Sequence, residues 1–262
     1  SPPCSVFSTA GVREEGWNTE KVFREGQAKQ RLDDLFLYFI AVAKRLQPKL
    51  VIAENVKGII IGNAKGWVNQ IVKGFDDAGY VVQIFLFNAA RMGVPQKRER
   101  VFFIARRKDL KYPKLSMEFH SKPIPFKDVR EPYGKPMDPA SMQAKLLKYR
   151  IPTDRCIADI NERVRKVKNN GFSTPINRDE EPVQTIVSGS SLYRMCDGLL
   201  MTDKDIISCQ TFPQDYDFMG QSVQYICGMS VPPVMMAKIS DQVYRQWLKG
   251  GDADEDAETE EI

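Results

Sequence analysis

Apolar residues recur at helical spacing across residues 29–47, on one face formed by Leu32, Leu35, Phe36, Phe39, Ile40, Ala43 and Leu46. This spacing predicts an amphipathic helix, and Pro48 ends it because proline cannot continue a helix. Residues 49–56 (KLVIAENV) are a short apolar run, typical of a strand, that finishes in polar residues. Residues 66–80 (GWVNQIVKGFDDAGY) return to helical spacing and stop at Gly79. The pattern therefore predicts helix, strand, helix.

Two further strand-like segments follow, VVQIFLFNA and RVFFIARRK. Strands that alternate with helices favour an α/β sheet, in which functional groups lie at the carboxyl ends of strands. Residues 109–184 are rich in proline, glycine and charge, with one predicted helix at about 154–168, and are interpreted as a small inserted domain. The α/β pattern resumes at 185–250 and closes with a helix that carries Met235, Ile239, Val243 and Trp247 on one face.

The composition excludes several classes of protein. Hydrophobic residues make up 42% of the chain, yet no apolar run is long enough to cross a bilayer, and no leader is recognised. The five cysteines are scattered and form no C-x-x-C motif, which argues against a disulfide framework or a zinc ribbon. A reducing, cytoplasmic location is expected. The single histidine, His120, lies in a polar stretch and is interpreted as a solvated loop residue.

The net charge of +4 is unevenly distributed. The last eleven residues, DADEDAETEEI, contain seven acids and no base, so the rest of the chain carries 38 minus 27, or +11. Such a basic body is compatible with a polyanionic partner. Residues 251–262 are interpreted as a disordered acidic tail.

Three short stretches contain candidate chemistry. Near the start, Pro3-Cys4 offers a thiol, and the first strand ends in Glu54-Asn55-Val56. The stretch GVPQKRERVFFIA places Gln96, Arg98 and Arg100 at alternate positions entering a strand, which predicts that all three side chains share one face. Each stretch alone is also compatible with an ordinary structural cysteine, a surface acid or a basic strand edge.

Taken in this order, the three stretches resemble the cytosine-C5 DNA methyltransferase family. TDKDIISCQTFP and GMSVPP are similar to the last two motifs of that family, so the resemblance spans about residues 1–247. It implies a Rossmann-like S-adenosylmethionine-dependent methyltransferase sheet, with the family's target recognition domain at 109–184. The catalytic domain would then comprise 1–108 and 185–250.

The resemblance also implies a mechanism. The Cys4 thiolate would add to carbon 6 of a cytosine flipped out of duplex DNA, Glu54 would engage the N3 and amino edge, and Arg98 would hold the carbonyl oxygen. S-adenosylmethionine would donate the methyl group. The implied site residues are Cys4, Glu54, Arg98 and Arg100 for catalysis, Pro3, Leu35, Ser230 and Val231 for the cofactor, and Ser8, Asn55, Val56 and Gln96 for DNA.

The family's F-x-G-x-G loop, which holds most of the cofactor, has no counterpart before Cys4. We therefore expect a sheet without its first strands, and either a partner polypeptide that carries those motifs or a fragment of a longer chain. Double-stranded DNA is the expected substrate, with no membrane and no metal. Two alternatives stay open, an RNA cytosine-C5 methyltransferase of the same fold and an inactive DNA-binding partner. The sequence leaves open the target site, for which the candidate base contacts are Arg150, Arg155, Arg163 and Arg165.

Overall fold

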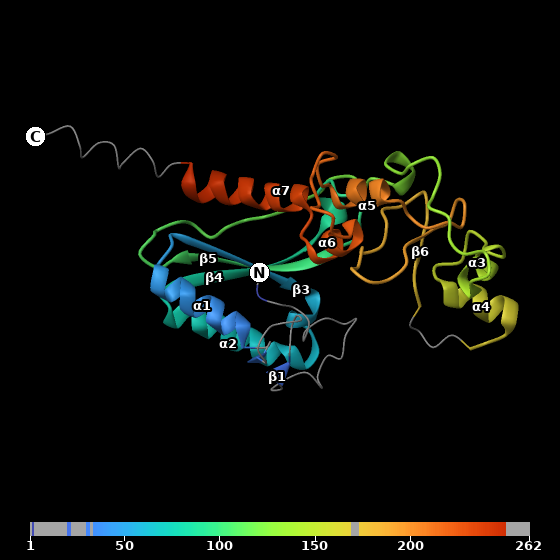
Figure 1. Ribbon diagram of the computed structural model, residues 1–262. Helices are drawn as coiled ribbons and strands as arrows, with labels where there is room; N and C mark the ends of the chain where they lie inside the picture. Colours follow the sequence, from blue (N-terminus) through green and yellow to red (C-terminus); the bar gives the residue numbers. More distant parts are fainter. Residues whose placement is uncertain (1, 3–19, 22–29, 32–33, 169–172, 250–262) are drawn as a thin grey trace, which may run out of the picture. The chain divides into compact units, whose positions relative to one another are not determined.

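The computed structural model describes residues 2, 20–21, 30–31, 34–168 and 173–249 (Figure 1). The chain divides into two compact units. Unit 1 comprises residues 1–87, 99–116 and 243–262, and unit 2 comprises residues 88–98 and 117–242. The predicted acidic tail at 251–262 lies outside the described residues.

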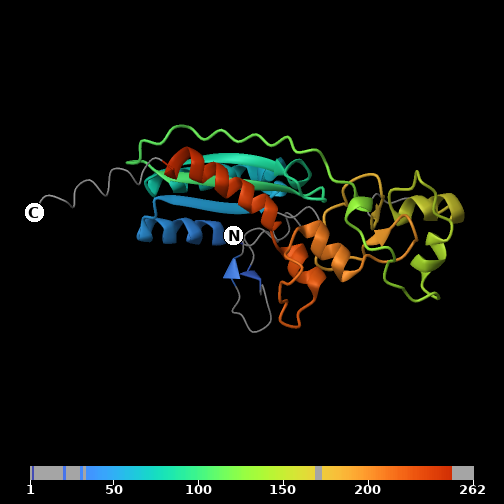
Figure 2. The ribbon, with the colours of Figure 1, turned by 90° about the horizontal axis from the view of Figure 1, so that it is seen from above.

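Unit 1 contains a three-stranded sheet of β3 (Leu50–Val56), β4 (Tyr80–Asn88) and β5 (Glu99–Arg107). The order is β3-β5-β4, and β3 runs antiparallel to β5, with Ala53 opposite Phe103 (Figure 2). Val51 and Ala53 alternate with half-exposed residues along β3, as the two-residue period of a strand requires. All three strands were expected from the sequence.

Helices α1 (Leu35–Leu46) and α2 (Lys65–Asp77) pack on one face of this sheet (Figure 1). Helix α1 ends at Gln47, whose φ of 48° is left-handed, directly before Pro48. Two 3₁₀ turns, Lys57–Ile60 and Gly62–Ala64, connect β3 to α2. Gly79 turns the chain into β4 with a φ of 91°, a conformation that favours glycine. Both predicted helix ends are confirmed.

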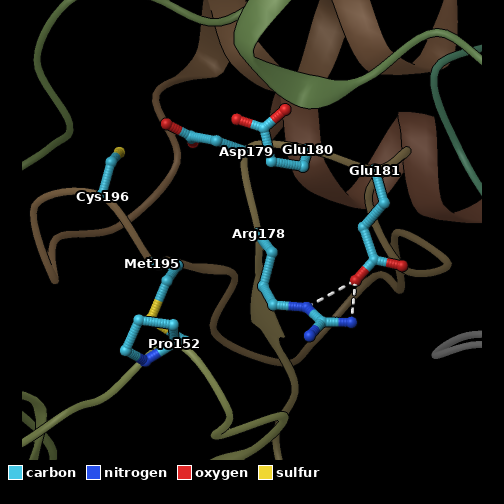
Figure 3. A pocket seen from close by; sticks show the side chains of 7 residues that line it. All are labelled: Pro152, Arg178, Asp179, Glu180, Glu181, Met195 and Cys196. Carbon is cyan, nitrogen blue, oxygen red and sulfur yellow. Dashed lines mark hydrogen bonds and ion pairs between the residues drawn. The ribbon is translucent and has the colours of Figure 1, made fainter.

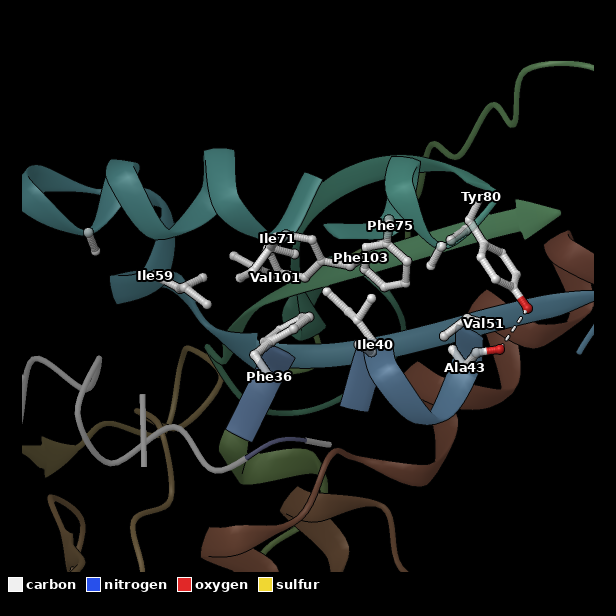
Figure 4. Packing of buried hydrophobic residues seen from close by; sticks show 14 residues of the cluster. Phe36, Ile40, Ala43, Val51, Ile59, Ile71, Phe75, Tyr80, Val101 and Phe103 are labelled. Atoms are coloured by element: carbon white, nitrogen blue, oxygen red, sulfur yellow. Dashed lines mark hydrogen bonds between the residues drawn. The ribbon is translucent and has the colours of Figure 1, made fainter. Parts of the chain in front are cut away.

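The core of unit 1 is apolar. Phe36 and Ile40 of α1 and Ile71 and Phe75 of α2 point toward Phe103 of β5 (Figure 4). The Phe36 and Phe103 rings meet edge to face, with centroids 5.0 Å apart, a favoured geometry for aromatic pairs. Burying this many large side chains is the main stabilising term for unit 1.

The chain returns to unit 1 at its C-terminal end. A π-helical turn, Tyr244–Leu248, carries the buried Trp247, whose indole Nε1 donates to the Pro113 carbonyl at 2.9 Å. The Tyr112 ring stacks on the same indole, with centroids 6.0 Å apart. These contacts fix the extended segment around residue 113.

Unit 2 consists mainly of loops and short elements. Its helices and strands are α3 (Met142–Leu147), α4 (Ile157–Arg165), α5 (Asp203–Gln210), α6 (Val223–Met229), most of α7 (Pro233–Val243), and the parallel pair β6 (Ile176–Asn177) and β7 (Tyr193–Arg194). Short 3₁₀ turns occur at Ala89–Arg91 and Phe126–Asp128. The two remaining strands, which pair antiparallel with each other, belong to unit 1: β1 (Glu20–Lys21) and β2 (Gln30–Arg31). Helix α3 was not predicted, because six residues give too little periodicity to recognise.

The predicted α/β class is confirmed by the alternation of strands and helices around the unit 1 sheet. The predicted domain boundaries stay a prediction. Among the described residues, the helices are all too short or too polar to cross a membrane.

Candidate active site

The candidate site begins where β3 ends. Along this strand, Val51 and Ala53 belong to the apolar core, while Glu54 projects from the opposite face. On the neighbouring strand, Phe102 stands opposite Glu54 and Arg100 stands opposite Val56. Glu54 and Arg100 are therefore diagonal neighbours on one face, within reach of long side chains.

This register brings the two charges into contact. The Arg100 Nε atom lies 2.9 Å from Glu54 Oε1, and the side chains are only 14% and 17% exposed. Arg100 Nη1 also donates to the Glu99 carbonyl at 2.8 Å, which fixes the guanidinium plane. The partial burial limits screening by solvent, so the pair is a preorganised carboxylate and cation at the end of a strand.

Asn55 and Val56 complete the strand end. Asn55 is 1% exposed, its Oδ1 accepts from the Val56 backbone N–H at 3.0 Å, and its Nδ2 donates to the Pro2 carbonyl at 3.4 Å. Val56 packs against the unit 1 core. Asn55 therefore links the strand end to the start of the chain.

Gln96 is fully buried in unit 2. Its Nε2 donates to Gln210 Oε1 at 2.5 Å and its Oε1 accepts from the Ile186 N–H at 3.0 Å. Gln210 in turn donates to the Ser230 carbonyl at 2.9 Å. The Gln96 amide therefore connects segments that are far apart in the sequence.

Arg98 has a similar position in unit 2. It is 2% exposed and donates from Nη1 to the Ile186 carbonyl and from Nη2 to the Gly228 carbonyl, both at 2.9 Å. Strand β5 begins only at Glu99, after Gln96 and Arg98. The pleat of the strand therefore does not set the directions of those two side chains, as the alternation predicted from the sequence had assumed. Gln96 and Arg98 bond within unit 2, whereas Arg100 bonds to Glu54 in unit 1.

The residues expected at the cofactor fall into both units. Leu35 begins α1 and packs on the unit 1 core, whereas Ser230 and Val231 belong to unit 2. Ser230 donates from Oγ to the Ile226 carbonyl at 2.7 Å and accepts at its carbonyl from Gln210. The Ser230 hydroxyl and carbonyl are thus used internally.

Three expected site residues, Pro3, Cys4 and Ser8, lie outside the described residues. The described cysteines differ in environment. Cys209 and Cys227 are buried, Cys156 is half-buried and Cys196 is exposed. Burial raises the pKa of the Cys227 thiol to about 12 and also raises that of Cys209, so both thiols stay protonated at neutral pH.

His120 lies on the surface, 3.3 Å from the Glu118 carboxylate, as expected of a loop residue. Within the part of the chain that the structure describes, no three His, Cys, Asp or Glu side chains come together to hold a metal ion.

The structure also shows a charged cluster that sequence reasoning missed. Glu181 accepts from Lys97 and, at 2.5 Å, from Arg178 Nε (Figure 3). Burial alone would raise the pKa of Glu181, but hydrogen bonds from these two cations outweigh it and lower the pKa. The only signal in the sequence was the dense charge of residues 178–181, which does not specify its partners.

The chain is similar to known proteins over most of its length. The model of the family described as C-5 cytosine-specific DNA methylase matches residues 1–245. Type II methyltransferase M.NgoFVII of Neisseria gonorrhoeae is 25% identical over 80% of this chain and 62% of its own length. Type II methyltransferase M.NgoPII of the same organism is 29% identical over 85% of this chain and 68% of its own length.

A solved structure shares the fold. The methyltransferase EhMeth of Entamoeba histolytica superposes with a TM-score of 0.56 at 12% identity, over 93% of this chain and 75% of its own. At that identity the likeness concerns the fold. The chain thus spans about two thirds of the length of the two curated relatives.

Proposed function

Because the chain belongs to the C-5 cytosine-specific DNA methylase family, we propose that it takes part in methylating carbon 5 of cytosine in duplex DNA. Members of this family use S-adenosylmethionine as methyl donor. The observation that carries the proposal is the Glu54–Arg100 pair at the end of β3, held at 2.9 Å by the strand register.

The pair matches one edge of cytosine. A carboxyl group can accept from the exocyclic amino group and share a proton with N3, while a guanidinium can donate to the carbonyl at position 2. We assign the second role to Arg100 in preference to Arg98. Arg100 touches the Glu54 carboxylate, whereas Arg98 donates to the carbonyls of Ile186 and Gly228.

Holding this edge favours attack on the ring. As the Cys4 sulfur bonds to carbon 6, the electron pair of the 5,6 double bond moves toward carbon 5 and N3. A proton shared by Glu54 at N3 and donation from Arg100 to the carbonyl would stabilise the negative charge that develops there. S-adenosylmethionine, when bound, supplies the methyl group. Transfer of the carbon 5 proton to solvent would then let the electron pair of that C–H bond re-form the 5,6 double bond, while the Cys4 sulfur leaves carbon 6 with its bonding pair as a thiolate.

Such chemistry needs the base outside the helical stack. Extruding a nucleotide costs a few kcal/mol, which contacts to the DNA backbone must offset. We assign target recognition to residues 109–184, which lie in unit 2 except for 109–116, and the methyl-transfer chemistry to the flanking segments. The expected partner polypeptide stays a prediction.

Covalent trapping tests the proposal. A duplex with 5-fluorocytosine cannot lose its carbon 5 substituent, so an active chain with S-adenosylmethionine should stay attached through Cys4 and migrate as a larger species. We expect Cys4→Ser and Glu54→Gln to abolish trapping. Arg100→Leu should reduce trapping at least a hundredfold, since about 2.7–4 kcal/mol is typical for one lost donor of this kind.

The arms of the experiment separate the alternatives. Trapping on single-stranded RNA but not on the duplex would favour an RNA methyltransferase. Duplex binding without trapping, with and without a polypeptide that carries the F-x-G-x-G motif, would identify an inactive partner and overturn the proposal. Calorimetric titration with S-adenosylmethionine under the same two conditions would show whether a partner is needed for cofactor binding.

A further inference from the structure

A polar pocket in unit 2 has a charge and a size that suit DNA. Its volume is about 430 Å³, and it is lined by Lys97, Arg155, Pro175, Ile176, Arg178, Glu181 and Gln184. Three of these side chains are cationic and one is a carboxylate, so the pocket carries a net positive charge. Pockets of this volume accept groups the size of a nucleotide unit.

Two of the three cations are held in place. Glu181 binds both Lys97 and Arg178, and all three side chains are at most 35% exposed. Figure 3 shows the Arg178 guanidinium reaching the Glu181 carboxylate. One carboxylate shared by two cations cannot neutralise both, and it fixes their positions without cancelling their charge.

Arg155 is the third cation, and its environment is different. Its backbone is fixed, because its N–H donates to Asp159 Oδ2 at 2.7 Å and its carbonyl accepts from Ile176 at 2.8 Å. Its side chain is exposed and forms no hydrogen bond or salt bridge within the part of the chain that the structure describes, but its charge acts on the neighbouring Asp159 carboxylate and helps to lower the pKa of that group. The backbone therefore holds an exposed guanidinium at the pocket.

The other three arginines that were considered as DNA contacts already have hydrogen-bond partners within unit 2. Arg150 donates to three backbone carbonyls, those of Leu147, Met195 and Cys196, at 2.6–3.0 Å. Arg163 binds Asp154 and the Tyr149 carbonyl, both at 2.7 Å. Arg165, at the end of α4, contacts only the Met142 sulfur, at 3.4 Å, and does not line the pocket.

We propose that this pocket binds a backbone phosphate of the substrate duplex, with Arg155 as the residue that neutralises it. The inference rests on the proposed function, because the ligand is the DNA that the enzyme methylates. An exposed cation beside two cations held by Glu181 suits a phosphate, whereas reading a base edge requires a guanidinium held in one orientation by neighbouring groups. Arg155 would therefore strengthen binding without contributing to sequence choice.

Fluorescence anisotropy with a labelled duplex tests this at several salt concentrations. Each phosphate contact adds about 0.9 to the slope of log Kd against log salt. Arg155→Gln should therefore lower the slope by about one and weaken binding roughly eightfold at 0.1 M salt. Arg155→Lys keeps the charge and should retain both the slope and the affinity.

Arg165→Gln is the matched control, since it removes an exposed arginine from a helix end outside the pocket. Equal losses for Arg155→Gln and Arg165→Gln would mean general electrostatic attraction and would overturn the proposal. A change in preference between two duplex sequences, or failure of Arg155→Lys to bind normally, would identify a base contact instead. If the unsubstituted chain traps the 5-fluorocytosine duplex while Arg155→Gln binds duplex normally, the assignment of the pocket to phosphate binding is wrong and the proposed function stands.

Discussion

Unit 1 has an apolar core, whereas unit 2 buries amide and charged groups. In unit 1, fourteen buried side chains from α1, α2, the sheet and the turns beside α2 form one cluster, in which Tyr80 is the only residue with a side-chain polar group. Among the described residues, seven of the eight buried polar or charged side chains belong to unit 2: Gln96, Arg98, Asp154, Asn177, Arg194, Asp205 and Gln210.

This difference has an energetic meaning. Apolar contacts are non-directional, so a core such as that of unit 1 tolerates substitutions that conserve volume. A buried charge or amide depends on specific partners, and removing one partner leaves the other desolvated without compensation. Unit 2 also has apolar clusters, around Phe126 and Ile160, but polar bonds connect its loops. Unit 2 should therefore be the less tolerant unit.

The largest expected effect is at Arg194, which is fully buried. It binds Asp205 at 3.2 Å, Asp197 at 3.0 Å and the Glu131 carbonyl at 3.0 Å. Arg194→Met keeps much of the volume but leaves two carboxylates without their cation, so we expect a loss of about 3–5 kcal/mol in the free energy of unfolding. Urea unfolding followed by circular dichroism measures it.

The control for this substitution is the double variant Arg194→Met with Asp205→Asn. Removing the charge of the most buried partner should restore only part of the loss, because no uncompensated carboxylate remains in the interior, but Asn keeps one acceptor oxygen for the two N–H groups, of Glu131 and Thr202, that Asp205 accepts from. A loss below about 1 kcal/mol for Arg194→Met alone would contradict the view that unit 2 depends on its buried charges.

A conservative change in the unit 1 core sharpens the comparison. Phe75 is fully buried and meets Tyr80 edge to face, with centroids 6.3 Å apart. Phe75→Leu keeps the position apolar with a modest loss of volume, so it should cost about 1.5 kcal/mol in the same urea titration. A cost equal to that of Arg194→Met would show that packing in unit 1 is just as specific as the polar bonds of unit 2.

A smaller effect is expected at the start of α5. Thr202 accepts from the Asp205 N–H at 3.0 Å, and Asp205 accepts from the Thr202 N–H at 2.8 Å, which together form a capping box. Thr202→Ala removes the hydrogen bond that the threonine hydroxyl accepts and should lower the free energy of unfolding by about 1 kcal/mol. Ser240→Ala, at an exposed position within α7, should change it by less than about 0.5 kcal/mol; equal effects would refute the capping contribution.

The smallest effect is a pH dependence in unit 2. Hydrogen bonds from Lys97 and Arg178 lower the pKa of Glu181 below its ordinary value of 4.5. Because the folded pKa is the lower one, the stabilisation is present above about pH 4.5 and is lost as the pH falls through the folded value. Melting temperatures of the unsubstituted chain and Glu181→Gln should therefore converge toward pH 3. A constant difference from pH 7 to pH 3 would rule out this ionisation.

Much of unit 1 could be predicted from the sequence. Helices α1 and α2 follow from a period of 3.6 residues, because each has one apolar face, and the three strands follow from short apolar runs; β5 is buried at five consecutive residues. In unit 2 the predicted helix near 154–168 exists as α4 at Ile157–Arg165, but α3 was missed. Elements shorter than two turns are stabilised by tertiary contacts, which leave no periodic signal.

The candidate site was likewise predicted from the sequence only in part. The motif residues Glu54 and Arg100 were identified from the sequence, and their ion pair follows from a strand register that puts Arg100 opposite Val56. The prediction that Gln96, Arg98 and Arg100 share one face assumed that alternation begins at Gln96. The strand begins only at Glu99, and before that point side-chain direction depends on which segments pack nearby.

The sequence by itself determined the family and the α/β class, because these depend on residue types at fixed spacings along the chain; the reactive groups that it indicates stay a prediction. Only the tertiary structure decided which charges form ion pairs: Arg100 with Glu54, and Lys97 and Arg178 with Glu181. Partners of a buried or shared charge are far apart in sequence, and their pairing depends on desolvation and distance, which exist only after the chain has folded.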